Sequence, residues 1–412
     1  MTEPKPPTEA AQTPERPVGL AARLELWHRA GGIAVPILTT IFAFFVGGLV
    51  VLAVSGKNPW GTYKAIFNGS GLNWFGEFCT GPTTGNACTS ANNLQQTLIQ
   101  FTVLVLTGLA VAFAFRCGLF NIGGQGQYII GTLVAVTVGT EFTSLPTAIH
   151  IIFAAGAAAV AGALWGGIAG ILKATVGAHE VITTIMLNWI ALWLATWMIG
   201  LSGPLVDPQA KLTQVAVTPN VADSAKLPIL WGNPILQALH YGLFVALGAL
   251  VVYWIVISRT TLGYQVRAVG FNAEAARYGG INVSRNYFLA MAIAGGFAGL
   301  AGSMDILGWQ FHLDDTFISS YSQIAFIGIA VALLGRNTAV GVFLAALLFA
   351  ALKTGTSTRN LDPDVFRPEL ANNLTQLIQG LVVLFVGADV LILWLYTKGR
   401  KLRLPTGRES KI

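Results

Sequence analysis

Long apolar runs alternate with short polar segments along almost the whole chain. A helix needs roughly 20 mostly apolar residues to cross the hydrocarbon core of a bilayer. About ten runs approach that length, at about 33–54, 94–115, 119–139, 146–172, 181–201, 234–257, 287–307, 321–335, 339–356 and 371–395. The pattern therefore predicts an all-α polytopic membrane protein with about ten transmembrane helices.

Composition agrees with this pattern and excludes a soluble globular domain. Of the 412 residues, 54% are hydrophobic and only 10% are charged, whereas about a quarter of the residues of a soluble domain are charged. We expect residues 1–30 to be a disordered cytoplasmic tail with an amphipathic lead-in, 31–398 a transmembrane domain and 399–412 a basic cytoplasmic tail. The first apolar run has no small-residue cleavage site after it, so we interpret it as a retained span.

Positive charges indicate how the chain is oriented, because cytoplasmic loops carry an excess of Lys and Arg. With the N-terminus inside, only seven of the 24 basic residues fall in outer segments: Lys57, Lys64, Lys211, Lys226, Lys353, Arg359 and Arg367. An even number of spans then predicts that both termini lie inside, an N-in and C-in arrangement. The net charge of +6 follows from this orientation and requires no nucleic-acid partner.

Residues 258–286 form a polar, arginine-bearing loop between two apolar runs. The loop predicts two short helices, over 262–269 and 273–278. The residues that begin and end them are Thr260 or Thr261 and Gly270 for the first, and Asn272, Gly279 and Gly280 for the second. Two helices outside the membrane are suited to dock a partner in the cytoplasm. The alternative is that the arginines only hold the loop inside.

A second polar feature lies inside an apolar region, in LFNIGGQGQYIIGT at residues 119–132. It carries the amides of Asn121, Gln125 and Gln127 among the glycines Gly123, Gly124 and Gly126. Buried amides are costly unless paired, and non-helical backbone at membrane depth is tolerated only within protein or beside a water-filled cavity. The segment predicts a broken helix beside a solute path. The alternative is a tight helix crossing in which the amides bond to each other.

A third polar feature is the column formed by Glu180, Thr184 and Asn188, which are four residues apart and share one helix face. An ionisable residue at the mouth of a span is a functional candidate, and we expect Asn188 to face the path. Alternatively, Glu180 stabilises the helix N-terminus through the helix dipole.

Three cysteines and one acidic cluster add little chemistry. Cys79 and Cys88 fall in the first predicted outer loop, and we expect them to form a disulfide. The alternative is two free thiols. Cys117 is expected to be a packing residue. A cluster near the outer end of the seventh run predicts a solvated rim and no metal site, because its members lack a repeated ligand spacing. Its members are Asp305, His312, Asp314 and Asp315. No catalytic or nucleotide-binding motif is present at a plausible site, so we predict no catalytic residue in this chain.

Four motifs together resemble a known family: LFNIGGQGQ, HEVITTIMLNWIA, TTLGYQVRAVGFNAEAARYGGI and IGIAVALLGRN. They are similar to motifs in the permease subunits of ATP-binding-cassette (ABC) importers, in the nucleoside and simple-sugar branch of the branched-chain amino acid and ribose type permeases. The resemblance covers roughly residues 30–398. It implies about ten helices in two related halves, in a bacterial cytoplasmic membrane.

The resemblance also implies partners. They are a second permease in a heterodimer, separate ABC ATPase subunits that hold ATP and Mg²⁺, and a substrate-binding lipoprotein or periplasmic protein. This chain itself would carry no cofactor and would translocate nucleosides. A monosaccharide permease and an ion-coupled secondary transporter are the alternatives.

The resemblance assigns roles to residues of this chain. The ATPase-coupling surface maps onto 260–286 and contains Arg267, Asn272, Glu274, Arg277 and Gly280. The solute path maps onto Asn121, Gln125, Gln127, Glu180 and Asn188, and we add Thr184 from the same column. One departure is that Glu274, Ala275, Ala276 and Gly280 match the start of the better-known importer signature, whereas its later Ile and Leu-Pro are missing.

Overall fold

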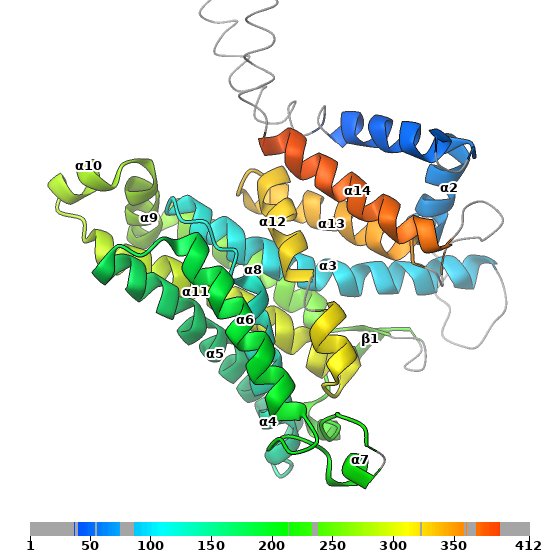
Figure 1. Ribbon diagram of the computed structural model, residues 1–412, viewed down its shortest axis with the longest axis horizontal. Helices are drawn as coiled ribbons and strands as arrows, with labels where there is room; N and C mark the ends of the chain where they lie inside the picture. The colour runs from blue at the N-terminus through cyan, green and yellow to red at the C-terminus, as the bar shows by residue number, and fades with distance from the viewer. Residues whose placement is uncertain are drawn as a thin grey trace, which may run out of the picture.

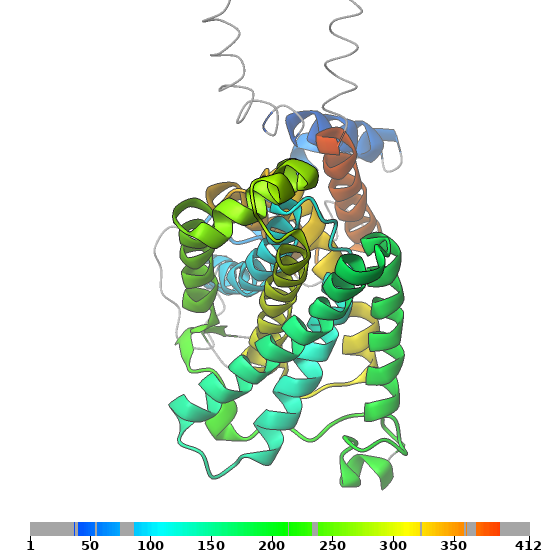
Figure 2. The ribbon, with the colours of Figure 1, turned by 90° about the vertical axis from the view of Figure 1, so that its left-hand side faces the viewer.

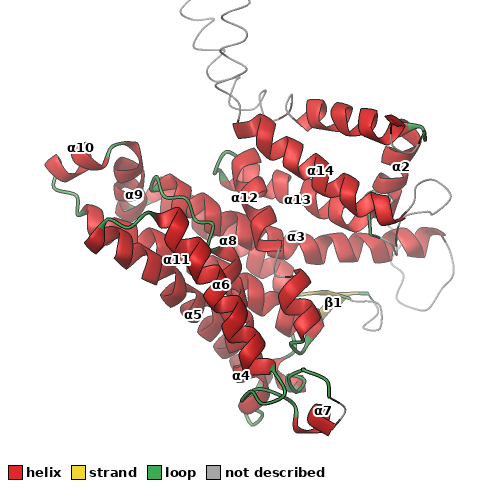
Figure 3. Cartoon of the chain, viewed as in Figure 1, coloured by secondary structure: helices red, strands yellow, loops and turns green. Residues whose placement is uncertain are grey.

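The structure is a computed structural model that describes residues 37, 40–53, 56–74, 86–212, 214–232, 238–321, 324–357, 360 and 368–387. It is built almost wholly of helices (Figure 3). In chain order the helices are Thr40–Ala53, α2 (Pro59–Gly69), α3 (Asn86–Arg116), α4 (Gly124–Glu141), α5 (Thr147–Val176), α6 (Glu180–Ile199), α7 (Pro208–Leu212), η1 (Asp223–Ala225), α8 (Gly242–Arg259), α9 (Thr261–Phe271), α10 (Ala273–Tyr278), α11 (Val283–Asp305), η3 (Ile306–Gln310), η4 (Phe317–Tyr321), α12 (Ile324–Leu334), α13 (Ala339–Gly355) and α14 (Pro368–Gly387). Two short strands, β1 (Ile229–Trp231) and β2 (Leu239–His240), pair antiparallel.

Each apolar run named above overlaps one of these helices. Within the described residues, six helices are long and apolar enough to cross a membrane, and two shorter apolar helices lie at Thr40–Ala53 and Ala339–Gly355. The chain is thus a predominantly helical protein with several helices suited to span a membrane. The count of ten, the two related halves and the orientation stay predictions, and the predicted tails lie outside the described residues.

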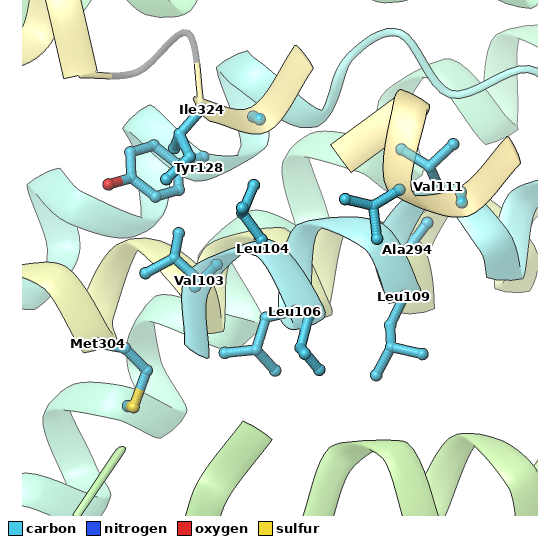
Figure 4. Packing of buried hydrophobic residues seen from close by; sticks show 14 of the residues in the cluster. Val103, Leu104, Leu106, Leu109, Val111, Tyr128, Ala294, Met304 and Ile324 are labelled. Carbon is cyan, nitrogen blue, oxygen red and sulfur yellow. The ribbon is translucent and has the colours of Figure 1, made fainter. Parts of the chain in front are cut away.

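Helix α3 lies at the centre of the packing (Figure 1). Leu104 points to the opposite side of α3 from Leu106 and Leu109, and all three are fully buried (Figure 4). A helix that is apolar all round is expected to be covered by protein or lipid on every side. Here the cover is protein, since most of the α3 span is buried by neighbouring helices.

Small residues allow α5 and α11 to approach each other closely. A Cβ on Gly162 would lie 2.4 Å from the Gly295 carbonyl oxygen, and one on Gly299 would lie 2.3 Å from the Ala158 carbonyl oxygen. Such distances are incompatible with any larger residue, so these positions require glycine. Close backbone approach at small residues is a common way of packing helices in membranes.

The loop between α8 and α11 forms the two predicted short helices, which lie at one end of the molecule, opposite α7 (Figures 1 and 2). Asn272 begins α10 by accepting a hydrogen bond from the Ala275 amide at 3.0 Å, as predicted. Gly280 ends it with φ of 79°, and the amides of Gly280 and Ile281 donate to the carbonyls of Arg277 and Ala276. This pattern is a Schellman motif.

The predicted boundary of the first short helix is wrong. Helix α9 continues to Phe271 and includes Gly270, which was expected to end it. A Cβ on Gly270 would lie 2.3 Å from the Arg116 carbonyl oxygen at the end of α3. Gly270 is therefore required for close packing against α3.

Candidate functional site

The polar segment before α4 is non-helical over residues 119–121, and α4 begins at Gly124. The predicted break is present. Asn121 and Gln127 are both buried and face each other across it. Asn121 Nδ2 donates to Gln127 Oε1 at 2.9 Å, and Gln127 Nε2 donates to Asn121 Oδ1 at 3.1 Å. The two side chains therefore bond to each other across the irregular turn.

Asn188 of α6 is the third amide of this group. Its Oδ1 accepts from the Gly126 amide at 2.8 Å, and its Nδ2 donates to the Ile122 carbonyl oxygen at 3.0 Å. A Cβ on Gly126 would lie 2.9 Å from Asn188 Oδ1, so glycine is needed for the contact. One side chain on α6 thus satisfies a donor and an acceptor of the broken backbone.

Thr184 and Glu180 lie one and two turns before Asn188 on α6. Thr184 is buried against Gly123, whose added Cβ would be 3.0 Å from Thr184 Cβ, and its hydroxyl donates to the Glu180 carbonyl oxygen at 2.7 Å. Glu180 is the first residue of α6, and one of its oxygens lies 2.8 Å from Lys173 Nζ in the last turn of α5. The predicted column exists, with the carboxylate at its end paired to a cation.

Gln125 differs from the other amides of the segment because its side chain is only half-buried. Its neighbour Gly124 faces α12, since an added Cβ there would lie 3.9 Å from Ala325 Cβ. The structure thus brings all six predicted path residues into one region between α4 and α6. It buries Asn121, Gln127, Thr184 and Asn188 and leaves Gln125 and Glu180 partly accessible.

The predicted coupling residues lie on α9 and α10 and are exposed to solvent. Glu274 Oε1 and Arg277 Nη1 are 3.8 Å apart, an exposed ion pair. Asn272 and Gly280 begin and end α10, as described above, and Arg267 lies on the exposed side of α9. These residues therefore share one surface.

Sequence reasoning missed two aromatic residues on that surface. Phe271 is 95% exposed and Tyr278 is 92% exposed. Large aromatic side chains are normally covered, and aromatic residues are enriched where proteins bind each other. The signal was present in the sequence as two aromatic residues in a polar loop that was predicted to lie outside the membrane.

The acidic cluster is not a solvated rim throughout, so that prediction is wrong for one member. Asp305 is 1% exposed. Its Oδ2 accepts from the Tyr128 hydroxyl of α4, and its Oδ1 accepts from Trp309 Nε1 at 2.7 Å. His312 and Asp314 form a partly exposed pair at 3.6 Å. Asp305 is buried because α11 continues into the π-helix η3, which places Trp309 over the carboxylate.

Of the three cysteines, Cys88 is disulfide-bonded. Cys79 lies outside the described residues, so its pairing with Cys88 stays a prediction. Cys117 is a free, buried thiol whose Sγ lies 3.7 Å from the Asn286 carbonyl oxygen, in agreement with a packing role.

Comparison with known proteins identifies the family. The sequence pattern of the branched-chain amino acid transport system permease component matches residues 93–387. The chain belongs to this family. It is therefore a permease component and not an enzyme, and ATP hydrolysis belongs to partner subunits.

Three curated relatives are similar over most of their length. The chain is 40% identical to the guanosine ABC transporter permease protein NupP of Bacillus subtilis, over 90% of this chain and 98% of the relative. It is 31% identical to the nucleoside ABC transporter permease protein NupB of Lactococcus lactis, over 92% and 97%. It is 34% identical to the glucose ABC transporter permease protein TsgB13 of Haloferax volcanii, over 85% and 86%.

Proposed function

We propose that this chain is a membrane-spanning subunit of an ABC importer and translocates nucleosides across a bacterial cytoplasmic membrane. The observation that carries the proposal is the 40% identity to a guanosine permease, which extends over 98% of that relative. A second relative that is named as a nucleoside permease supports it. Because both similarities span nearly whole chains, they cover the polar segments as well as the helical framework.

The candidate path suits a neutral polar solute. Amides can donate to and accept from a nucleobase and a ribose, and their desolvation costs less than that of a charged side chain. Asn121, Gln127 and Asn188 fix the non-helical backbone at the start of α4. Gln125 is the half-buried amide beside them, and we assign it the contact with the solute.

The exposed α9–α10 surface is the ATPase-docking site in this proposal. It lies at one end of the helical packing, as a cytoplasmic docking site must (Figures 1 and 2). Its exposed aromatic residues and ion pair offer a partner both apolar area and charge. The remaining partners are a second permease in a heterodimer and a binding protein that delivers the nucleoside from outside.

A glucose permease is the second candidate, because the chain is 34% identical to one over 85% of its length. Sugar hydroxyls can bond the same amides. Nucleosides are favoured by the greater identity and coverage of the guanosine permease.

The test is uptake by the reconstituted complex. The chain is co-purified with its ATPase, second permease and binding protein, and placed in vesicles loaded with ATP. We expect accumulation of radiolabelled guanosine that is abolished without ATP and is competed by other nucleosides but not by glucose. Accumulation of glucose alone would favour the second candidate, and uptake that follows an ion gradient without ATP would contradict both.

A further inference from the structure

The turn between α12 and α13 holds a carbonyl group with three donors. The Asn337 oxygen accepts from Arg116 Nε at 2.9 Å, from Arg116 Nη2 at 2.6 Å and from the Tyr253 hydroxyl at 2.7 Å. A carbonyl oxygen has two lone pairs, so three donors saturate it. Hydrogen bonds from a charged guanidinium are stronger than neutral ones. The turn is thus held firmly by α3, which carries Arg116, and by α8, which carries Tyr253.

The same turn has an unusual backbone. Arg336 and Asn337 have φ of 48° and 53°, in the left-handed region that few residues other than glycine adopt. Such conformations persist only where the surroundings enforce them. A Cβ on Gly341 would lie 2.0 Å from the Gly335 carbonyl oxygen, so the start of α13 is pressed against the end of α12. The turn is therefore compact, and a displacement of it displaces both helices.

Both elements that hold this turn also contact α9. Gly270 of α9 lies against the end of α3. A Cβ added to Gly270 would lie 2.3 Å from the Arg116 carbonyl oxygen. Gly263 at the other end of α9 lies against α8, where an added Cβ would be 2.1 Å from the Val256 carbonyl oxygen. Neither contact leaves room for sliding, because both are backbone to backbone. A shift of α9 is thus passed directly to the end of α3 and to α8.

Helix α12 runs from this turn toward the candidate path. Its 11 residues span about 16 Å at the usual rise per residue. Helix α12 begins at Ile324. The next residue, Ala325, faces Gly124. An unbroken series of contacts thus links the exposed α9–α10 surface to the start of α4.

We propose that Arg116 and Tyr253 are positioning residues that transmit movement of the ATPase-docking helices to the solute path through the Asn337 carbonyl. This inference rests on the proposed function, because it requires an ATPase on α9 and α10. Arg116 and Tyr253 touch neither ATP nor solute. They fix the α12–α13 hairpin to the helices that move with the ATPase.

The experiment compares Tyr253→Phe, which removes one hydroxyl, and Arg116→Lys, which keeps the charge but loses the planar pair of donors. Uptake of guanosine and ATP hydrolysis are measured in the same vesicles. We expect uptake per ATP hydrolysed to fall about fivefold, the net effect of one hydrogen bond, while basal hydrolysis and membrane abundance stay within about twofold of the unaltered protein. The effect of bound guanosine on the affinity of the complex for ATP should weaken in parallel, since coupling between two binding sites is reciprocal.

Tyr241→Phe is the matched control, because Tyr241 is an exposed residue just before the other end of α8. It should leave uptake per ATP unchanged. An unchanged ratio in both Tyr253→Phe and Arg116→Lys would overturn the inference. So would an equal loss of uptake and hydrolysis, which would indicate a role in folding or docking. If the unaltered complex takes up no guanosine with ATP, the proposed function itself fails, whatever the variants do.

Discussion

At the residue scale, the amide segment shows what a sequence pattern can and cannot assign. The residues Asn121, Gln127 and Asn188 were predicted together from their positions in apolar runs, and the structure brings them together. Which amide faces a solute could not be predicted, because the same composition suits a path and a tight crossing. The contacts with the backbone separate the two: Asn188 bonds to Gly126 and Ile122, whereas the Gln125 side chain is half-buried.

The first prediction separates these two roles. Gln125→Leu should lower guanosine uptake about threefold or more, the cost of one lost polar contact, with unchanged membrane abundance and basal ATP hydrolysis. Asn188→Leu should lower abundance as well, because it leaves the Gly126 amide and the Ile122 carbonyl unpaired. Thr183→Val on the same helix is the control, since the Thr183 hydroxyl bonds only carbonyls of its own helix turn. Normal transport by Gln125→Leu would show that Gln125 makes no contact with the solute that transport requires.

Asp305 could not be placed from the sequence, because its burial depends on the π-helix that brings Trp309 over it. A second prediction follows. Asp305→Ala removes the carboxylate that accepts from the Tyr128 hydroxyl and from Trp309 Nε1, and should destabilise the protein by about 1–3 kcal/mol. Asp305→Asn keeps an acceptor for Trp309 and should cost less. Thermal unfolding of the purified protein measures both.

Asp223→Asn is the control for that measurement, because Asp223 pairs with Lys226 at the surface, where its side chain is 95% exposed. It should not change the unfolding temperature. The same unfolding temperature for Asp305→Ala and the unaltered protein would show that the buried carboxylate contributes nothing.

At the scale of elements, the apolar runs located the helices, and local capping rules located α10 to the residue. The rules failed where tertiary packing decides. Gly270 resembles a helix terminator, yet it lies inside α9 because the end of α3 passes over it. The π-helices η3 and η4 and the short β1–β2 pair left no periodic signal in the sequence.

The third prediction tests the α9–α3 contact. In Gly270→Ala the added Cβ would meet the Arg116 carbonyl at 2.3 Å, so α9 must move away from α3. We expect faster proteolysis within 258–286 and loss of most ATP-driven uptake, with the helical content retained by circular dichroism. Gly248→Ala is the control, since an added Cβ on this glycine of α8 meets nothing within 4 Å. Equal protease resistance of the two variants would mean that α9 tolerates the displacement.

At the scale of the whole molecule, the main feature is the separation between the end that carries the α9–α10 surface and the end that carries α7. Helices α9 and α10 lie at one end and α7 at the other, so a partner at the first end is separated from the second by the length of the spanning helices (Figure 1). The sequence predicted a docking loop, but the residues assigned to that loop as coupling residues were mostly polar. Phe271 and Tyr278 were not singled out, because aromatic residues in a short helix usually pack inward, whereas here both are exposed.

The last prediction ranks the contributions to ATPase docking. An aromatic side chain buries about 150–250 Å² at an interface, whereas an exposed ion pair contributes at most about 1 kcal/mol. Replacing Phe271 and Tyr278 together by alanine should therefore abolish co-purification of the ATPase. Replacing Glu274 and Arg277 together should only weaken co-purification, while still lowering uptake. The control is Leu212→Ala, because Leu212 on α7 is 87% exposed at the opposite end.

The aromatic variant, the charge variant and Leu212→Ala should all reach the membrane in normal amounts, since the altered side chains are exposed and none is packed in the core. Full retention of the ATPase by the aromatic variant would place the docking surface elsewhere. A greater loss in the charge variant than in the aromatic one would show that electrostatic attraction, and not apolar burial, holds the ATPase. In that case raising the salt concentration should weaken retention of the ATPase by the unaltered protein, because surface charges are screened over about 10 Å at 0.1 M ionic strength.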